Sequence, residues 1–283
     1  MDYYISNKNI KIPAIIYGTA WKKEETSKYV QSALLSGFRG IDTAGQPKHY
    51  QEHLVGEGLL KAYESGLKRE DIYLQTKFTP INGQDINNMP YEKDSSLPNQ
   101  IRQSFEKSKE NLHTNYIDSY ILHSPLFPSS KLKLAWSTME SFYENKEVGQ
   151  LGISNCYDLS VLKYLYENSK VKPSLVQNRF YAQTDYDVGI RKWCKEKGII
   201  YQGFWTLTAN PEVVSSQIIS NLADKYTKTN SQIFYRFLHH IDVIPLIGTT
   251  SKAHMADDIA IFEFELEEKE IKSLLELIIP INI

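Results

Sequence analysis

Several features that would place this chain in a specialised class of protein are missing from its sequence. It has only two cysteines, Cys156 and Cys194, without Cys-x-x-Cys spacing, so neither a disulfide framework nor a zinc site is indicated. No apolar run approaches the roughly 18 residues that a membrane-spanning helix needs. Residues 1–11 alternate polar and apolar side chains and lack the long apolar stretch of a secretory signal. We therefore expect a cytoplasmic protein with reduced thiols and no membrane attachment.

An excess of charge of one sign is missing as well. The 283 residues include 34 acidic and 32 basic side chains, a net charge of −2. This balance gives no electrostatic footprint for nucleic acid or an anionic membrane. Gly/Ser tracts, proline-rich runs and charge blocks are also absent, so no linker is marked. We predict one domain over residues 1–283, a monomer or weak oligomer, with a small molecule as its partner.

What the sequence does contain is a regular alternation of short apolar segments and longer amphipathic ones. The short segments are bounded by turn-forming residues, as is typical of strands buried on both faces. There are eight of them, at 14–18, 40–43, 72–77, 117–122, 151–154, 174–178, 198–203 and 242–247. Helical spacing of apolar residues is found at 24–35, 54–63, 98–112, 133–144, 159–167, 187–197, 211–225, 231–238 and 267–277.

This order predicts parallel strands joined by helical crossovers. The first strand is followed by a single glycine, Gly18, and not by the Gly-x-Gly-x-x-Gly turn of an open dinucleotide-binding sheet. Eight strand–helix units in a chain of this length fit a closed barrel better than an open sheet. The predicted fold class is therefore α/β, a (β/α)8 TIM barrel.

The active site of such a barrel lies at the carboxyl ends of its strands. Asp42, Lys77 and His123 close three successive predicted strands, so we expect all three to face one opening. Each has an ordinary explanation when taken alone: a helix-capping aspartate, a surface lysine, a loop histidine. A buried lysine beside an aspartate loses hydration energy, so the combination is more typical of a functional site than of a core.

The motifs along the chain resemble those of the aldo-keto reductase family. They are GFRGIDTA at 37–44, YQEHLVG at 50–56, LQTK at 74–77, YILHSP at 120–125, GQLGISN at 149–155, VQN at 176–178 and IPLIGTT at 244–250. The resemblance runs from a hairpin region at 3–12 to about Asp258. It implies an N-terminal β-hairpin before the barrel, and an NADP-dependent oxidoreductase that reduces a carbonyl compound by hydride transfer.

The resemblance also implies a catalytic tetrad of Asp42, Tyr50, Lys77 and His123. Tyr50 would be the general acid that protonates the developing alkoxide. A tyrosine hydroxyl has a pKa of about 10, and the Lys77 ammonium beside it would lower that pKa by favouring the phenolate. Asp42 would hold the lysine, and His123 would orient the carbonyl oxygen.

Cofactor-binding residues follow from the same resemblance. Ser154, Asn155 and Gln177 would hydrogen-bond the nicotinamide carboxamide, and Phe204 would stack on its ring. The turn at 248–252 and the helix that starts after it would take the adenosine phosphate through backbone N–H groups. The full predicted set is Thr19, Trp21, Ser154, Asn155, Gln177, Phe204, Trp205, Leu207, Gly248, Thr249, Thr250, Ser251, Lys252, His254 and Asp258.

Three departures from the family pattern leave alternatives open. Counted back from Glu52, the family's tyrosine position falls on His49, so His49 is a rival to Tyr50 as the acid. The usual Ser-Pro-Leu-Gly after the seventh strand is replaced by Trp-Thr-Leu-Thr at 205–208. His254 stands where many members have an arginine for the 2′-phosphate, and Lys252 could compensate. We expect NADPH, with NADH as the alternative.

Two other functions compete with carbonyl reduction. Some barrels of this family are cofactor-binding regulatory subunits with slow turnover, and a complete tetrad does not exclude that role. A metal-dependent hydrolase would need a His-x-His motif or a carboxylate cluster at the strand ends, and neither is present. The physiological substrate does not follow from the sequence.

Overall fold

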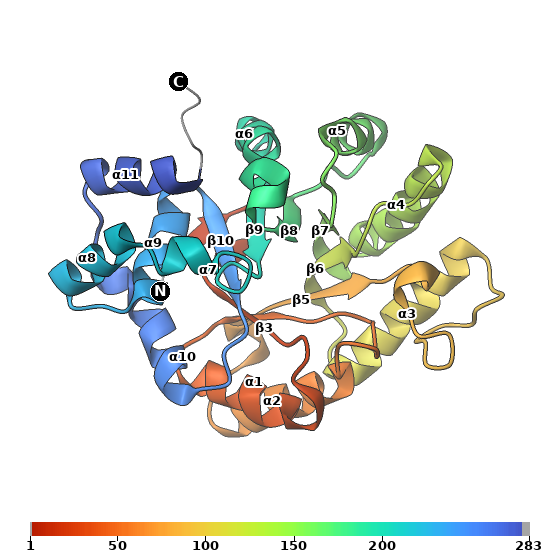
Figure 1. Ribbon diagram of the computed structural model, residues 1–283. Coiled ribbons are helices and arrows are strands. Elements are labelled where there is room, and N and C mark those ends of the chain that lie inside the picture. The colour runs from red at the N-terminus through yellow and green to blue at the C-terminus, as the bar shows by residue number, and fades with distance from the viewer. Residues whose placement is uncertain (1, 279–283) are drawn as a thin grey trace.

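The computed structural model describes residues 2–278, and its centre is a closed barrel of eight parallel strands with helices around it (Figure 1). The strands follow one another around the barrel in the order β10-β3-β4-β5-β6-β7-β8-β9. Their bounds are β3 Ile16–Gly18, β4 Gly40–Asp42, β5 Tyr73–Phe78, β6 Ile117–Leu122, β7 Val148–Ser154, β8 Leu175–Arg179, β9 Ile200–Phe204 and β10 Val243–Ile247. Each overlaps one of the eight predicted strands, so the predicted (β/α)8 barrel is confirmed.

A two-stranded antiparallel hairpin, β1 (Tyr3–Ile5) and β2 (Lys11–Pro13), precedes the barrel. Its Ile12 side chain is fully buried with a small set of barrel residues: Ile16, Tyr73, Ile244 and Leu246. The hairpin therefore closes the amino-terminal end of the barrel and leaves the opposite end for ligands. The hairpin implied by the family resemblance is confirmed.

The helices that follow the strands cover the outside of the barrel. They are α1 Thr26–Leu35, α2 Glu52–Glu64, α3 Leu97–Leu112, α4 Ser129–Glu144, α5 Leu159–Asn168, α6 Val188–Lys197, α7 Pro211–Val214, α8 Gln217–Tyr226, α9 Asn230–His240, α10 Lys252–Ile259 and α11 Glu268–Ile278. The predicted helix at 211–225 is two helices, because the chain turns at Ser216, whose side chain caps α8 by accepting from the Ile219 amide. Helix α10 is complete where the sequence indicated only a start.

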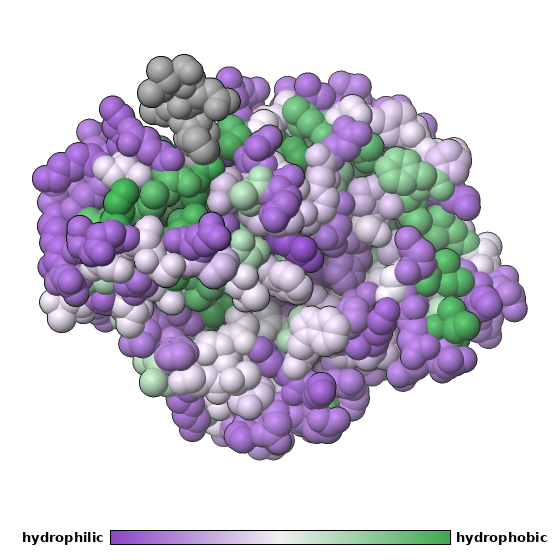
Figure 2. Space-filling view, in the orientation of Figure 1, coloured by the Kyte–Doolittle hydropathy of each residue, from purple (hydrophilic) through white to green (hydrophobic). Residues whose placement is uncertain are grey.

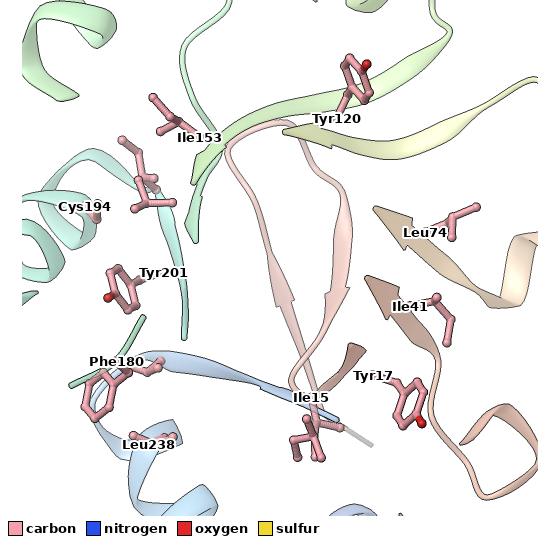
Figure 3. Packing of buried hydrophobic residues seen from close by; sticks show 14 of the residues in the cluster. Ile15, Tyr17, Ile41, Leu74, Tyr120, Ile153, Phe180, Cys194, Tyr201 and Leu238 are labelled. Atoms are coloured by element: carbon pink, nitrogen blue, oxygen red, sulfur yellow. The ribbon is translucent and has the colours of Figure 1, made fainter. Parts of the chain in front are cut away.

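The barrel wall separates an apolar outer layer from a polar interior. Figure 3 shows Ile41, Leu74, Tyr120 and Tyr201 pointing away from the centre of the ring of strands, toward the helices. Successive strand residues point to opposite faces, so the neighbours of these residues point inward. Many of the inward-pointing positions around the barrel hold buried polar side chains: Gln75, Ser119, Gln150, Gln177 and Gln202. The inward layers of such barrels are usually filled by branched apolar residues, so this interior is unusually rich in amides.

The outer surface of the barrel is mostly polar on the face that Figure 2 shows. Hydrophilic residues cover most of the face drawn in Figure 2, and the apolar ones lie in separate small patches. No helix within residues 2–278 is long and apolar enough to cross a bilayer. Cys156 and Cys194 are both free thiols, and both are buried.

Candidate active site

The carboxyl ends of the barrel strands surround one cleft of about 890 Å³. It is lined by residues from the segments that follow β3, β4, β6, β7, β8, β9 and β10, and by part of α10. Most of the site residues predicted from the sequence line it. They are Trp21, Asp42, Tyr50, His123, Asn155, Gln177, Phe204, Trp205, Leu207, Gly248, Thr249, His254 and Asp258.

Other predicted cofactor-binding residues lie outside the lining of the cleft. Thr19 and Ser154 are fully buried, and their hydroxyls donate to the backbone carbonyls of Asp42 (2.9 Å) and Gln177 (2.7 Å). Ser251 caps α10 by accepting from the His254 amide. Thr250 and Lys252 flank that cap. Thr19 and Ser154 thus brace strand ends, and the turn at 250–252 shapes the start of α10.

The predicted Asp42–Lys77 pair is a buried ion pair beneath the cleft. Asp42 ends β4 and Lys77 lies in β5, and Nζ of Lys77 is 2.6 Å from Oδ1 of Asp42. The same Nζ donates to the Thr43 carbonyl at 2.8 Å. The two side chains are only 1% and 3% exposed. Burial lowers the pKa of Lys77, and the Asp42 charge opposes that shift. Such a pair is weak evidence for stability and is typical of a functional site.

Tyr50 lies above this ion pair. Nζ of Lys77 is 5.3 Å from the centroid of the Tyr50 ring, and the ring centroids of Tyr50 and His123 are 6.1 Å apart. Burial raises the pKa of the phenol, and the Asp42 charge raises it further, so the net lowering expected from the Lys77 charge is not found in the cleft. The tyrosine is therefore protonated at neutral pH, as a proton donor must be.

His123 follows β6 and presents one ring nitrogen to the cleft. Its Nδ1 is 2.6 Å from Oγ1 of Thr79, which leaves Nε2 for a ligand. Burial and the positive charge of Lys77 hold the pKa of His123 well below its ordinary value of 6.5. The imidazole is thus neutral, and it can donate a hydrogen bond without carrying a charge.

His49, the rival acid, also lines the cleft. Its ring packs on the indole of Trp21 with 4.0 Å between centroids, and the Trp21 amide donates to the His49 carbonyl at 2.8 Å. Burial lowers the pKa of this imidazole as well. His49 belongs to the wall that Trp21 forms, whereas Tyr50 lies over the lysine.

Comparison with known proteins identifies the family of the chain. The profile of the "Aldo/keto reductase family" matches residues 14–210 of the 283, which takes in β3 to β9 and the whole tetrad region. The chain belongs to the aldo/keto reductase family. It is therefore an oxidoreductase.

Relatives of this aldo/keto reductase are similar to it over almost the whole chain. The 9,11-endoperoxide prostaglandin H2 reductase of Trypanosoma cruzi is 26% identical over 96% of this chain and 89% of its own. The NADPH-dependent alpha-keto amide reductase of Saccharomyces cerevisiae is 25% identical over 98% and 90%. The crystal structure of an aldo-keto reductase from a Medee basin deep-sea metagenome library superposes with a TM-score of 0.82 at 25% identity, over 97% of this chain and 94% of that one.

Two cations of the cleft were missed by the sequence reasoning. Nζ of Lys22 donates to the Gly248 carbonyl and so connects the segments after β3 and β10. The Arg179 guanidinium lies 4.2 Å from the centroid of a Trp205 ring, and its Nε is buried without a hydrogen-bond partner among the described residues. Lys22 directly follows Trp21, a predicted site residue, and Arg179 directly follows the VQN motif at 176–178. A candidate set extended by one residue at each of these strand ends would have included both cations.

Three residues of the cleft have left-handed backbone conformations although none is glycine. Trp21, Asn155 and Trp205 have φ values of 64°, 52° and 57°, and each comes shortly after a barrel strand. Such conformations cost roughly 1–2 kcal/mol per residue and cluster at functional sites. They turn these three side chains into the cleft.

Proposed function

We propose that this protein reduces the carbonyl group of a small aldehyde or ketone with NADPH, and that Tyr50 is the general acid. The observation that supports this most strongly is the buried Asp42–Lys77 pair beneath a protonated phenol and a neutral imidazole. These are the groups needed to deliver a proton to a developing alkoxide and to polarise a carbonyl. Membership of the aldo/keto reductase family supports the same chemistry.

The residues of the cleft fit a nicotinamide dinucleotide. Its volume of about 890 Å³ is within the range of about 300–1,000 Å³ that ligand sites occupy. Phe204 offers an aromatic surface, and Asn155 and Gln177 offer amides that match a carboxamide. Lys22 and Arg179 offer positive charge for phosphate groups. When bound, the cofactor supplies the hydride.

The protein's own residues supply the proton and stabilise the groups that exchange it. Tyr50 donates its proton to the alkoxide oxygen, and the Lys77 ammonium stabilises the phenolate that remains. Asp42 keeps Lys77 in position inside the barrel. His123 donates a hydrogen bond from Nε2 to the carbonyl oxygen, which orients the substrate and stabilises the charge that develops on that oxygen.

We propose NADPH rather than NADH as the preferred cofactor. The yeast relative is named as NADPH-dependent. In this chain His254 lines the cleft at the start of α10, and the amino end of a helix favours a phosphate group. The bidentate guanidinium of an arginine holds a phosphate more strongly than an imidazole does, so we expect a preference for NADPH smaller than an arginine would give.

The test is a turnover assay of the purified protein with a panel of small aldehydes, ketones and sugars. We expect oxidation of NADPH, and slower oxidation of NADH, with at least one class of carbonyl compound. Cofactor binding is measured in parallel by nicotinamide fluorescence. Tight NADPH binding without reduction of any compound would overturn the proposal in favour of a cofactor-binding regulatory subunit.

A further inference from the structure

Several polar side chains inside the barrel donate hydrogen bonds to one carboxylate oxygen. Oδ1 of Asp42 accepts from Lys77 Nζ at 2.6 Å, from Gln75 Nε2 at 2.7 Å and from Gln177 Nε2 at 3.0 Å. All four side chains are buried. Gln75 lies in β5 and Gln177 in β8, so Asp42 is held from both sides of the barrel.

A third glutamine braces the other two. Gln202, in β9, exchanges amide hydrogen bonds with Gln75 at 2.9 and 3.0 Å. Its Oε1 also accepts from Gln177 Nε2 at 3.0 Å. On the side of the hairpin, the hydroxyl of Tyr73 donates to Gln75 Oε1 at 2.9 Å. Both amide protons of Gln75 and both of Gln177 thus have acceptors.

This arrangement fixes which end of each amide faces Asp42. An ionised carboxylate only accepts hydrogen bonds, so Gln75 and Gln177 must turn their Nε2 atoms toward it. The Oε1 atom of Gln177 then has no partner among residues 2–278, while the residue lines the cleft. Gln177 therefore offers an acceptor to a ligand, and a donor such as the –NH2 of a carboxamide suits it.

The amide donors of Gln75 and Gln177 also affect the Asp42–Lys77 ion pair. Both amides share Oδ1 of Asp42 with Lys77, so they offset part of the negative charge that faces the lysine. More of the lysine's positive charge is then felt by the Tyr50 ring, 5.3 Å from Nζ. Loss of a donor would concentrate the Asp42 charge and weaken that effect on the phenol.

We propose that Gln75 and Gln202 are positioning residues, which hold the Asp42 carboxylate and the Gln177 amide in the orientations that proton transfer and carboxamide binding require. They touch neither substrate nor cofactor. They couple the proton-donating group to the nicotinamide end of the cleft. This inference rests on the proposed carbonyl reduction.

The test replaces each glutamine by methionine, which has a similar shape and no amide. Gln150 gives a matched control: it is a fully buried glutamine in β7, and it donates to Ser119 Oγ at 2.7 Å without touching Asp42. For Gln75→Met and Gln202→Met we expect kcat to fall about ten-fold. The alkaline limb of the pH profile of kcat should move up by roughly one pH unit, because Tyr50 becomes less acidic. Gln150→Met should keep the wild-type profile.

A binding measurement separates this inference from the proposed reaction. Gln202→Met should bind NADPH about ten-fold more weakly and bind adenosine 2′,5′-bisphosphate, which lacks nicotinamide, as the wild type does. A wild type that reduces no carbonyl compound while this binding difference persists would overturn the proposed function and leave the positioning of Gln177 supported. The inference would be overturned if the methionine variants at Gln75, Gln202 and Gln150 had the same pH profile of kcat and the same NADPH affinity as one another.

Should the methionine variants not fold, Gln202→Glu and Gln150→Glu repeat the comparison with a side chain of the same shape. The carboxyl group of Gln202→Glu would lie against the amides of Gln75 and Gln177 and, once ionised, could donate no hydrogen bond to Gln75. We expect its kcat to fall as pH rises through the titration of the new carboxyl group, with Gln150→Glu unaffected in that range. Parallel profiles for the two variants would count against the positioning role.

Discussion

The rings of His49 and Trp21 are in contact, with their centroids 4.0 Å apart and their planes tilted by 38°, and this contact separates the roles of two neighbouring residues. The His49 ring packs against Trp21 in the wall of the cleft. Tyr50, the next residue, lies over Lys77. The one-residue shift of the tyrosine from the family's position therefore places His49 in the wall, and we expect it to leave the acid at Tyr50.

The first prediction tests this assignment. In Tyr50→Phe the ring and its packing remain and the proton donor is lost. General acid catalysis contributes about 10²–10⁴-fold, so kcat should fall by that factor while NADPH binding, followed by nicotinamide fluorescence, stays near the wild-type value. His49→Ala removes a wall residue and should lower kcat only mildly. If Tyr50→Phe keeps more than half of the wild-type turnover and His49→Ala is inactive, the acid is His49.

The second prediction concerns the buried ion pair. Lys77→Met leaves Asp42 buried without its charged partner, which typically costs about 3–5 kcal/mol of unfolding free energy. It should also abolish most turnover, because the phenol loses the charge that stabilises its ionised form. The double variant Asp42→Asn/Lys77→Met removes both charges, so its unfolding free energy in denaturant should recover.

Turnover of that double variant should not recover, and the contrast between the two measurements is the control. A double variant that regains both stability and activity would show that the pair only holds the barrel together. A double variant as unstable as Lys77→Met would show that the unpaired carboxylate is not the cause of the loss.

Much of this fold could be predicted because its information is local. Each barrel strand is a short apolar run between turn-forming residues, and Asp42, Lys77 and His123 come at the ends of such runs. Because parallel strands present their carboxyl ends at one edge, the convergence of these residues in one cleft followed from the strand order. The break at Ser216 was missed because the apolar spacing continues through it.

The polar interior and the strained backbone could not be predicted in the same way. Gln75 and Gln202 lie inside β5 and β9, which are far apart in the sequence, and only the closed barrel brings the two amides together. The left-handed Trp21 donates its amide to the carbonyl of His49, which lies in the segment after the next strand. A single sequence contains no local signal for either feature, because both arise from tertiary contacts.

The third prediction is a pH dependence of stability that arises from Asp258. Burial, and then the charge of Asp257, raise the pKa of Asp258 from 3.8 to about 7. Between these two values the folded protein keeps a proton that the unfolded chain has lost, so the unfolding free energy falls as pH rises through this window. Asp258→Asn has no carboxyl group at this position, so its unfolding free energy should not fall in this way.

The unfolding free energy of Asp258→Asn, relative to the wild type, should thus rise across the window by up to about 4 kcal/mol. Denaturant titrations at several pH values measure the difference. Asp257→Asn gives a comparison: removal of the neighbouring charge should lower the pKa of Asp258 and narrow the window. Wild-type and Asp258→Asn curves that run parallel across the window would contradict the assignment.

The fourth prediction concerns cofactor preference. His254 lines the cleft at the first turn of α10, whereas Lys252 lies outside the lining. In His254→Arg a permanently charged, bidentate donor replaces an imidazole ring. One charge-assisted hydrogen bond contributes roughly 1.5–3 kcal/mol, so NADPH binding should tighten by about ten-fold or more, with little change for NADH because it lacks the 2′-phosphate.

Lys252→Ala is the matched control for this variant, since it removes a cation from the same helix start outside the lining of the cleft. We expect it to change the NADPH dissociation constant less than His254→Arg does. Fluorescence titrations with both cofactors give all the constants needed. An unchanged preference in His254→Arg would mean that the 2′-phosphate is bound away from the start of α10. The cations Lys22 and Arg179, which share the cleft, would then be the next residues to replace, because a phosphate in this cleft has to be neutralised by a charge that reaches it.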